Sequence, residues 1–301
     1  MNFLSRMPPA RLGACGALLS MTTVQLGVAA SVGFFDRIGA RGTAWLRLVW
    51  AAVIFLIVAR PWRSTWTRKN LLTCAALGVV TAVMTLSFMT AVSRIPLGTA
   101  SALEFLGPLT IGVLRGKGSA RLWAVAAAAG VLLMTGPWAS SANLVGVGFA
   151  LIAGLCWGAY ILLTQRAGDA VEGVQALAIS MPVAALVATI IVGPSTFGRL
   201  SWSVMASGIG LALLMPVIPF TLELLALRRL QTAAFGILMS IEPAIALLIG
   251  VALLGQVPQL TAALGVLLVV SAGVGAARSG ARDGASEPAW NTSELIDQAV
   301  R

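Results

Sequence analysis

The chain has 301 residues, of which 58% are hydrophobic and only 10% are charged. Soluble globular domains carry about 25% charged residues, so this composition excludes a water-soluble protein. The net charge of +10 agrees with basic loops that stay on one side of a membrane, and we expect no nucleic-acid partner. Because the sequence has no histidine, neither an imidazole proton shuttle nor a Ser/His/Asp set can form. We expect no metal, no cofactor and no enzymatic activity.

Apolar stretches of about 20 residues recur along the chain, and a helix of this length crosses a hydrocarbon core of about 30 Å. They predict an all-α integral membrane protein embedded in the lipid bilayer. In chain order, we expect ten transmembrane helices at residues 11–32, 41–60, 70–92, 97–114, 122–138, 144–165, 174–193, 202–224, 232–254 and 259–277. The remaining residues, 279–301, are polar and are predicted to form a tail.

The distribution of Lys and Arg predicts the orientation of these helices. With both termini placed in the cytoplasm, 15 of the 20 basic residues fall in cytoplasmic segments, four fall in the opposite loops, and Arg47 lies within a span. Loops that remain in the cytoplasm are rich in Lys and Arg. The sequence therefore predicts a multi-pass protein whose N- and C-termini are both cytoplasmic.

The chain resembles itself at a shift of 135 residues. Residues 93–109 (SRIPLGTASALEFLGPL) align with residues 228–244 (RRLQTAAFGILMSIEPA), and Pro108 falls on Pro243. One repeat unit would contain five spans, an odd number, so the second copy would cross the membrane in the opposite direction.

We therefore expect two inverted five-helix repeats, at residues 1–139 and 140–278, followed by the cytoplasmic tail at 279–301. Inverted repeats are typical of alternating-access transporters, whose substrate site lies near the middle of the membrane. The alternative is a duplicated membrane protein with a purely structural role.

Four ionisable residues lie within the predicted spans: Arg47, Glu104, Glu223 and Glu242. Each would cost roughly 2.5–3.5 kcal/mol at a helix centre, so each needs a partner or water. Arg47 and Glu104 lie at matching depths, about 10 Å from the same face. They indicate either an ion pair that fixes helix packing or the two ends of a site for a zwitterion, and these roles are compatible. Glu223 lies near the inner end of its span and is interpreted as an interfacial charge.

Two prolines and a set of polar and aromatic residues complete the candidate site. Pro108 and Pro243 each remove a helical hydrogen bond, which predicts interrupted, gating helices at equivalent places in the two halves, or simple kinks. The expected substrate cavity is completed by residues of other spans: Gln25, Thr81, Thr85, Phe88, Trp157 and Tyr160. Gly154 and Gly158 form a G-x-x-x-G pair, which predicts close helix packing.

Three stretches carry a family resemblance: IPLGTASALEFLGPL (95–109), CWGAYILLTQRAG (156–168) and IPFTLELLALRRLQTAAFGILMSIEPA (218–244). Through them the chain resembles the drug/metabolite transporter superfamily, and within it the bacterial amino-acid exporters of the EamA type. The resemblance implies a ten-helix, two-repeat exporter of the bacterial inner membrane. Two positions depart from the family pattern: Gln256 stands where an acid is frequent, and Gln231 stands where proline is usual.

These observations predict a secondary transporter that exports amino acids. The resemblance implies substrates of the threonine and homoserine type, or a broader set that includes aromatic ones. Arg47 would bind the α-carboxylate, and Glu104 or Glu242 would bind the α-ammonium group. The aromatic residues and threonines would line the side-chain pocket. Two alternatives remain at this point: export of drugs or metabolites through the same cavity, and a structural or receptor-like membrane protein without flux.

Overall fold

The computed structural model describes residues 9–63, 65–115, 120–135, 143–170, 175–227 and 238–282. Within these ranges the ordered elements are all helical. They are α1 (Pro9–Val32), α2 (Phe35–Ala59), η2 (Pro61–Arg63), α3 (Arg68–Val92), α4 (Leu97–Arg115), α5 (Ala120–Thr135), α6 (Leu144–Ala170), α7 (Gln175–Thr196), η3 (Phe197–Arg199), α8 (Trp202–Ala212), η4 (Leu213–Val217), α9 (Ile218–Leu227), α11 (Glu242–Leu254) and α12 (Leu260–Arg282).

Six segments in the described part of the chain are long and apolar enough to cross a membrane. They are Leu12–Val32, Phe35–Arg63, Arg68–Val92, Leu144–Thr164, Gln175–Arg199 and Trp202–Glu223. Shorter apolar helices follow at Leu122–Met134, Glu242–Leu254 and Leu260–Gly275. The protein is therefore a multi-pass membrane protein, whereas the count of ten crossings stays a prediction.

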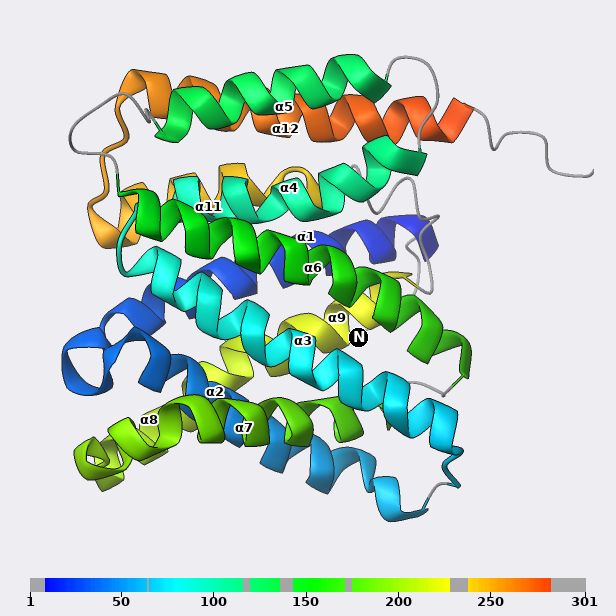
Figure 1. Cartoon of the computed structure of the whole chain (residues 1–301), viewed down its shortest axis with the longest axis vertical. Coiled ribbons are helices and arrows are strands. Elements are labelled where there is room, and N and C mark those ends of the chain that lie inside the picture. Colours follow the sequence, from blue (N-terminus) through cyan, green and yellow to red (C-terminus); the bar gives the residue numbers. More distant parts are fainter. Residues whose placement is uncertain are drawn as a thin grey trace, which may run out of the picture.

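The helices run side by side in two layers (Figure 1). One layer contains α5, α4, α6, α3 and α7 in that order, and the other contains α12, α11, α1, α9 and α2. The layers pack against each other through α5 with α12, α4 with α11, and α2 with α7. Within the layers, α6 packs between α4 and α3, while α1 packs between α11 and α9. This arrangement surrounds α1 and α6 with helices from distant parts of the sequence.

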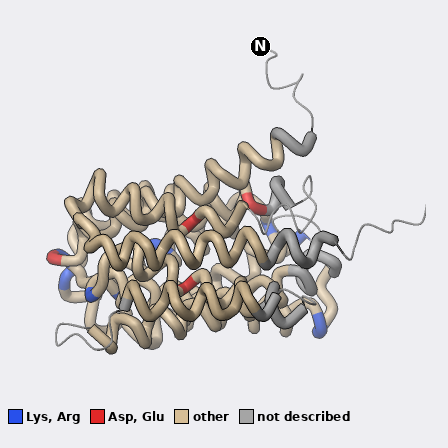
Figure 2. Tube along the Cα trace, turned by 90° about the horizontal axis from the view of Figure 1, so that it is seen from above, with Lys and Arg blue, Asp and Glu red and all other residues tan. Residues whose placement is uncertain are grey.

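Charged residues gather at the two ends of the helices, with few between them (Figure 2). One end carries the exposed residues Asp36, Arg37, Arg41, Arg94 and Arg199, and we call it the Arg199 end. The other carries the exposed residues Arg60, Arg63, Arg68 and Lys69, and we call it the Lys69 end. Charges remain in water at both ends while the apolar middle matches a hydrocarbon layer.

The span predicted at 202–224 is interrupted. Its helical turns divide into α8, the π-helical segment η4 and α9, and Met215 has extended backbone angles (φ −160°, ψ 118°). The interruption packs on α1 at Gly27, where a Cβ atom would lie only 2.9 Å from the Cβ of Met215. Ser20 of α1 then donates a hydrogen bond of 2.9 Å to the carbonyl oxygen of Pro219. Glycine at position 27 thus allows α1 to lie directly against this bend.

Candidate functional site

A buried hydrogen bond between Gln25 and Glu242 marks the candidate site. Gln25 of α1 is fully buried, and its Nε2 donates to Oε1 of Glu242 at 3.0 Å. The same nitrogen lies 3.5 Å from the Oγ of Ser101 on α4. These contacts join α1, α4 and α11, whose polar side chains would otherwise be unsatisfied in an apolar interior.

Glu242 stands at the first position of α11, directly after a turn at residues 240–241. Pro243 follows in the first helical turn, where its missing N–H removes no helical hydrogen bond. Glu242 is only 6% exposed. The first turn of a helix favours a carboxylate because its free N–H groups carry partial positive charge. The helix start that we expected near Pro243 is therefore present, and it positions a buried carboxylate.

Glu104 of α4 lies within electrostatic reach of Glu242. It is one helical turn beyond Ser101, so both face the same side of α4. The Glu104 side chain is half-buried and makes no hydrogen bond to any described residue. Two carboxylates that interact in an apolar setting repel each other unless a proton or a cation compensates them. We call Gln25, Ser101, Glu104 and Glu242 the carboxylate cluster.

Gln25 leaves one polar atom of this cluster unpartnered. Its Oε1 is buried and has no hydrogen-bond partner among the described residues. A buried carbonyl oxygen without a donor costs about 1–3 kcal/mol. A ligand with several N–H donors, such as an ammonium group, would satisfy both this oxygen and the nearby carboxylates.

Arg47 of α2 is anchored away from the carboxylate cluster. It is 1% exposed, and its Nη1 donates to the Oγ of Ser31 at 3.0 Å. Ser31 is six residues beyond Gln25, which corresponds to about 9 Å along α1. No carboxylate of the described residues forms an ion pair with Arg47, and its buried Nε has no acceptor. The expected Arg47–Glu104 ion pair is thus not formed, because the arginine side chain reaches toward the end of α1.

Tyr160 and Trp157 of α6 are both buried and make ring contacts. The ring of Tyr160 lies 5.6 Å from that of Phe220 on α9. The ring of Trp157 meets Phe105 edge to face at 6.2 Å, and Phe105 follows Glu104 directly in α4. These contacts connect the aromatic residues of α6 to α9 and to α4.

Glu223 has surroundings that the sequence did not predict. It lies one turn beyond Phe220 on α9, and it is within electrostatic reach of both Tyr160 and Glu242. Arg228 and Arg229, which follow α9 in the sequence, lie outside the described residues. Phe220 and Glu223 are three residues apart and therefore lie on one helical face. This spacing is the sequence signal that would have placed Glu223 on the same side of α9 as Phe220.

Thr85 and Phe88 lie on α3 and are buried, with exposures of 7% and 2%. Thr81, also on α3, donates its hydroxyl to the carbonyl oxygen of Leu77. The described contacts include no hydrogen bond or ring contact from these three residues to the carboxylate cluster. Their helix packs against α6, which carries Trp157 and Tyr160.

The predicted interruption at Pro108 is wrong, because α4 continues through this proline to Arg115. The carbonyl oxygen of Glu104, which loses its helical donor to Pro108, lies against Gly154 of α6. A Cβ atom on Gly154 would be 2.7 Å from that oxygen, and a Cβ atom on Gly107 would collide with the carbonyl of Gly154. The glycines allow a close backbone approach, in which Cα–H groups can face carbonyl oxygens. Neighbouring helix α6 thus accommodates the proline without a break.

Gln256 connects α11 with α4, the helices that carry Glu242 and Glu104, at the Arg199 end. Gly255 ends α11 in the left-handed conformation (φ 64°), which glycine adopts without strain. The side-chain Oε1 of Gln256 then accepts a hydrogen bond of 2.8 Å from the backbone N–H of Leu97, the first residue of α4. The position at which the family often carries an acid therefore holds a helix cap in this chain.

Metal-binding geometry is not seen in the described residues, which contain no group of three His, Cys, Asp or Glu side chains suited to a metal ion. The three cysteines, Cys15, Cys74 and Cys156, are free thiols.

Comparison with known proteins gives consistent results. The model of the EamA-like transporter family matches residues 144–276. The chain is 36% identical over 263 residues to the threonine/homoserine exporter RhtA of Escherichia coli strain K12. The aligned region covers 85% of this chain and 88% of that relative. RhtA of Salmonella typhimurium strain SL1344 is 34% identical over 262 residues, covering 86% of this chain and 88% of its own.

One solved structure, described only as the crystal structure of a protein, shares the fold. It superposes with a TM-score of 0.56 over 89% of this chain and 96% of that chain, at 19% sequence identity. The apolar helical bundle agrees with a family of transporters, and the identity of 36% over 85% of the chain shows the relationship. The chain belongs to the EamA-like transporter family.

Proposed function

We propose that this protein is a secondary transporter that exports amino acids across the bacterial inner membrane by alternating access. The observation that carries the proposal is the carboxylate cluster, in which the buried pair Gln25–Glu242 lies within electrostatic reach of Glu104 in the apolar part of the bundle. Its helices come from both ends of the sequence. The relatives named as threonine/homoserine exporters support small hydroxylated amino acids as the substrate class.

The proposed architecture is ten transmembrane helices in two inverted repeats, residues 1–139 and 140–278, with a cytoplasmic tail at 279–301. Support comes from the pairing of the layers. The pairs α2 with α7, α4 with α11, and α5 with α12 are those that the 135-residue shift relates. A pseudo-twofold axis between the layers would produce this pairing.

We place the Lys69 end in the cytoplasm together with both termini. The motivation is the bias of Lys and Arg toward the segments on that side. The Arg199 end then faces the periplasm, and the capping contact of Gln256 with Leu97 lies on the periplasmic side of the cluster. The proposed cycle opens this side while it closes the cytoplasmic side.

In the proposed site, the substrate ammonium group binds between Glu104 and Glu242. The unpartnered Oε1 of Gln25 would accept one of its N–H groups. Arg47 would receive the α-carboxylate through its unpartnered Nε. An ammonium group beside two acids and a carboxylate beside a buried guanidinium each replace lost hydration.

Counterflow of labelled amino acids into proteoliposomes tests the proposal. We expect threonine or homoserine to be taken up, and we expect little competition from a threonine analogue that lacks either the ammonium or the carboxylate group. Glu104→Gln and Glu242→Gln should abolish counterflow. Asp36→Asn, which changes an exposed carboxylate at the Arg199 end, is the control. Undiminished counterflow in both glutamate variants, with normal folding, would contradict the site.

Drug or metabolite export is the second candidate. The ring contacts of Trp157 with Phe105 and of Tyr160 with Phe220 favour it, because buried aromatic faces bind flat organic cations. Competition separates the two functions. If amino acids are the substrates, an excess of threonine should block counterflow. If an aromatic cation is the substrate, an excess of threonine should leave the flux of that cation unchanged.

A further inference from the structure

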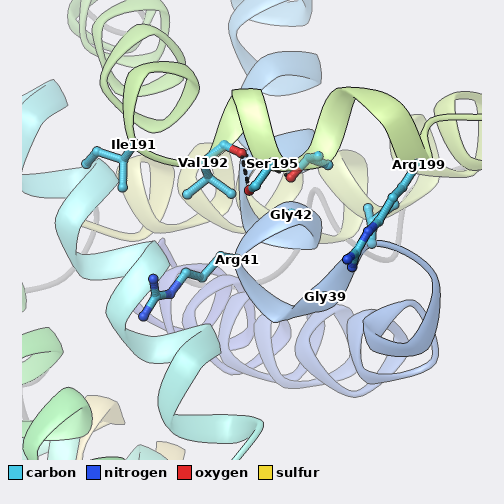
Figure 3. A pocket seen from close by; sticks show the side chains of 9 residues that line it. Gly39, Arg41, Gly42, Ile191, Val192, Ser195 and Arg199 are labelled. Atoms are coloured by element: carbon cyan, nitrogen blue, oxygen red, sulfur yellow. Dashed lines mark hydrogen bonds between the residues drawn. The ribbon is translucent and has the colours of Figure 1, made fainter.

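A pocket of about 310 Å³ opens at the Arg199 end, between the start of α2 and the end of α7. Figure 3 shows residues 38–42 of α2 on one side and residues 191–196 of α7 on the other, with Arg199 at the rim. The α2 backbone leaves the helical conformation at Gly39 (φ 75°, ψ 164°). The pocket thus lies where one helix bends and the other ends.

The lining of this pocket is basic. Arg41 and Arg199 are among its lining residues, and none of the lining residues is acidic. The two side chains point in different directions, with Arg199 turned toward the start of α2 and Arg41 turned away from it (Figure 3). Arg41 is held by its neighbours, since its Nε donates to Thr90 at 3.4 Å and its guanidinium lies 5.7 Å from the ring centre of Phe149. Arg199 is exposed and has no hydrogen bond or ion pair within the described chain. Uncompensated arginines in a concave site favour an anion with several acceptor oxygens.

Two exposed apolar residues beside the pocket indicate that it borders the head groups of the bilayer. Ile191 on its wall is 56% exposed, and Trp202, three residues beyond Arg199, is 91% exposed. An exposed tryptophan next to an apolar helix surface is typical of the membrane–water interface. An occupant can therefore place a charged group near Arg199 and an apolar chain along Ile191.

The floor of the pocket is closed toward the protein interior. A Cβ atom on Gly42 would lie 3.1 Å from the side chain of Thr196, so α2 and α7 touch there. Deeper along the same helices, Trp45 donates its indole N–H to Thr189 at 2.8 Å. The pocket thus does not continue into the carboxylate cluster, and a substrate leaving that cluster would not pass through it.

We propose that this pocket binds the head group of an anionic phospholipid from the leaflet at the Arg199 end, with the phosphate at Arg199 and an acyl chain along α7. The inference does not depend on which substrate the protein transports. A bound lipid would join α2 to α7, which belong to different proposed repeats.

Native mass spectrometry and thermal unfolding of the purified full-length protein test this inference. Titration with phosphatidylglycerol should leave a retained lipid and raise the melting temperature, whereas phosphatidylcholine should do neither. Arg199→Gln should weaken phosphatidylglycerol binding about fivefold, in line with about 1 kcal/mol for each basic residue near an anionic lipid. Arg41→Gln is the second variant, and it should weaken binding less than Arg199→Gln, because the Arg41 guanidinium is turned toward Thr90 and Phe149.

Arg37→Gln is the matched control. Arg37 is exposed on the same helix, its guanidinium lies over Phe34, and it does not line the pocket. Equal weakening in Arg37→Gln and Arg199→Gln would overturn the proposal in favour of general surface attraction. Equal stabilisation by inorganic phosphate alone would overturn it in favour of a free-anion site. The experiment measures lipid binding, so its result can be interpreted even if the transport assay shows no amino-acid flux.

Discussion

The side-chain Oε1 of Gln256 accepts a hydrogen bond from the backbone N–H of Leu97 at 2.8 Å, across 159 positions of sequence. The contact caps the first turn of α4, whose initial N–H groups have no helical acceptor. A Cβ atom on the neighbouring Gly98 would lie 2.9 Å from the Cα of Leu247 on α11. The helices that carry Glu104 and Glu242 are therefore held together at the Arg199 end by a cap and by close packing.

We expect that removing this cap lowers the stability of the protein measurably. Gln256→Ala should lower the free energy of unfolding by about 0.5–2 kcal/mol, the usual effect of losing a side-chain cap. Gln256→Glu should match or exceed the wild type, because a carboxylate favours a helix N-terminus. Thermal unfolding in detergent measures both effects. Gln259→Ala, at an exposed position of the same connection, should be neutral, and an equal loss there would assign the effect to the loop itself.

The buried amide of Gln25 gives a prediction for substrate affinity. Gln25→Leu keeps the size of the side chain but removes the donor to Glu242 and the free Oε1 acceptor. Loss of such an interaction costs about 1–3 kcal/mol, so we expect amino-acid binding to weaken about 5- to 150-fold. Binding to the purified protein by calorimetry checks this value. Thr22→Val, on the same helix with only a local bond to Leu18, is the control.

Arg47 gives a prediction that separates binding from folding. A buried cation without an ionic partner is costly to the folded state, so Arg47→Met should leave the melting temperature unchanged or raise it. If the guanidinium binds the substrate carboxylate, the same variant should lose amino-acid counterflow. A lower melting temperature together with unchanged substrate affinity would assign Arg47 to the anchoring of Ser31 near the end of α1.

Most helices of the bundle could be predicted from the sequence, because the length of an apolar run directly reflects the thickness of the bilayer. Each expected span coincides with at least one helix of the described chain. The breaks within helices were harder to predict. Proline weakens a helix locally, but the glycines of a neighbouring helix decide whether it stays continuous, as Pro108 and Gly154 show.

The buried polar residues of the carboxylate cluster were easier to predict from the sequence than the contacts they make. Gln25, Glu104 and Glu242 were recognised because polar groups are rare in apolar spans. The hydrogen bond between Gln25 and Glu242 joins positions 217 residues apart, and its formation depends on how three helices pack. Equal depth suggested that Arg47 meets Glu104, but depth does not determine the direction in which a long side chain extends.

The close contact of α4 with α6 gives the last prediction. Gly154→Ala would place a Cβ atom 2.7 Å from the carbonyl oxygen of Glu104, and the helices would have to separate. Such overpacking costs about 1–3 kcal/mol, so the melting temperature should fall. Gly148→Ala changes the same helix where nothing lies within 4 Å of the new Cβ atom, and it should be neutral. Since Glu104 would move with α4, Gly154→Ala should also weaken amino-acid binding. Equal stability of Gly154→Ala and Gly148→Ala would instead show that α4 and α6 are not in close contact in the membrane.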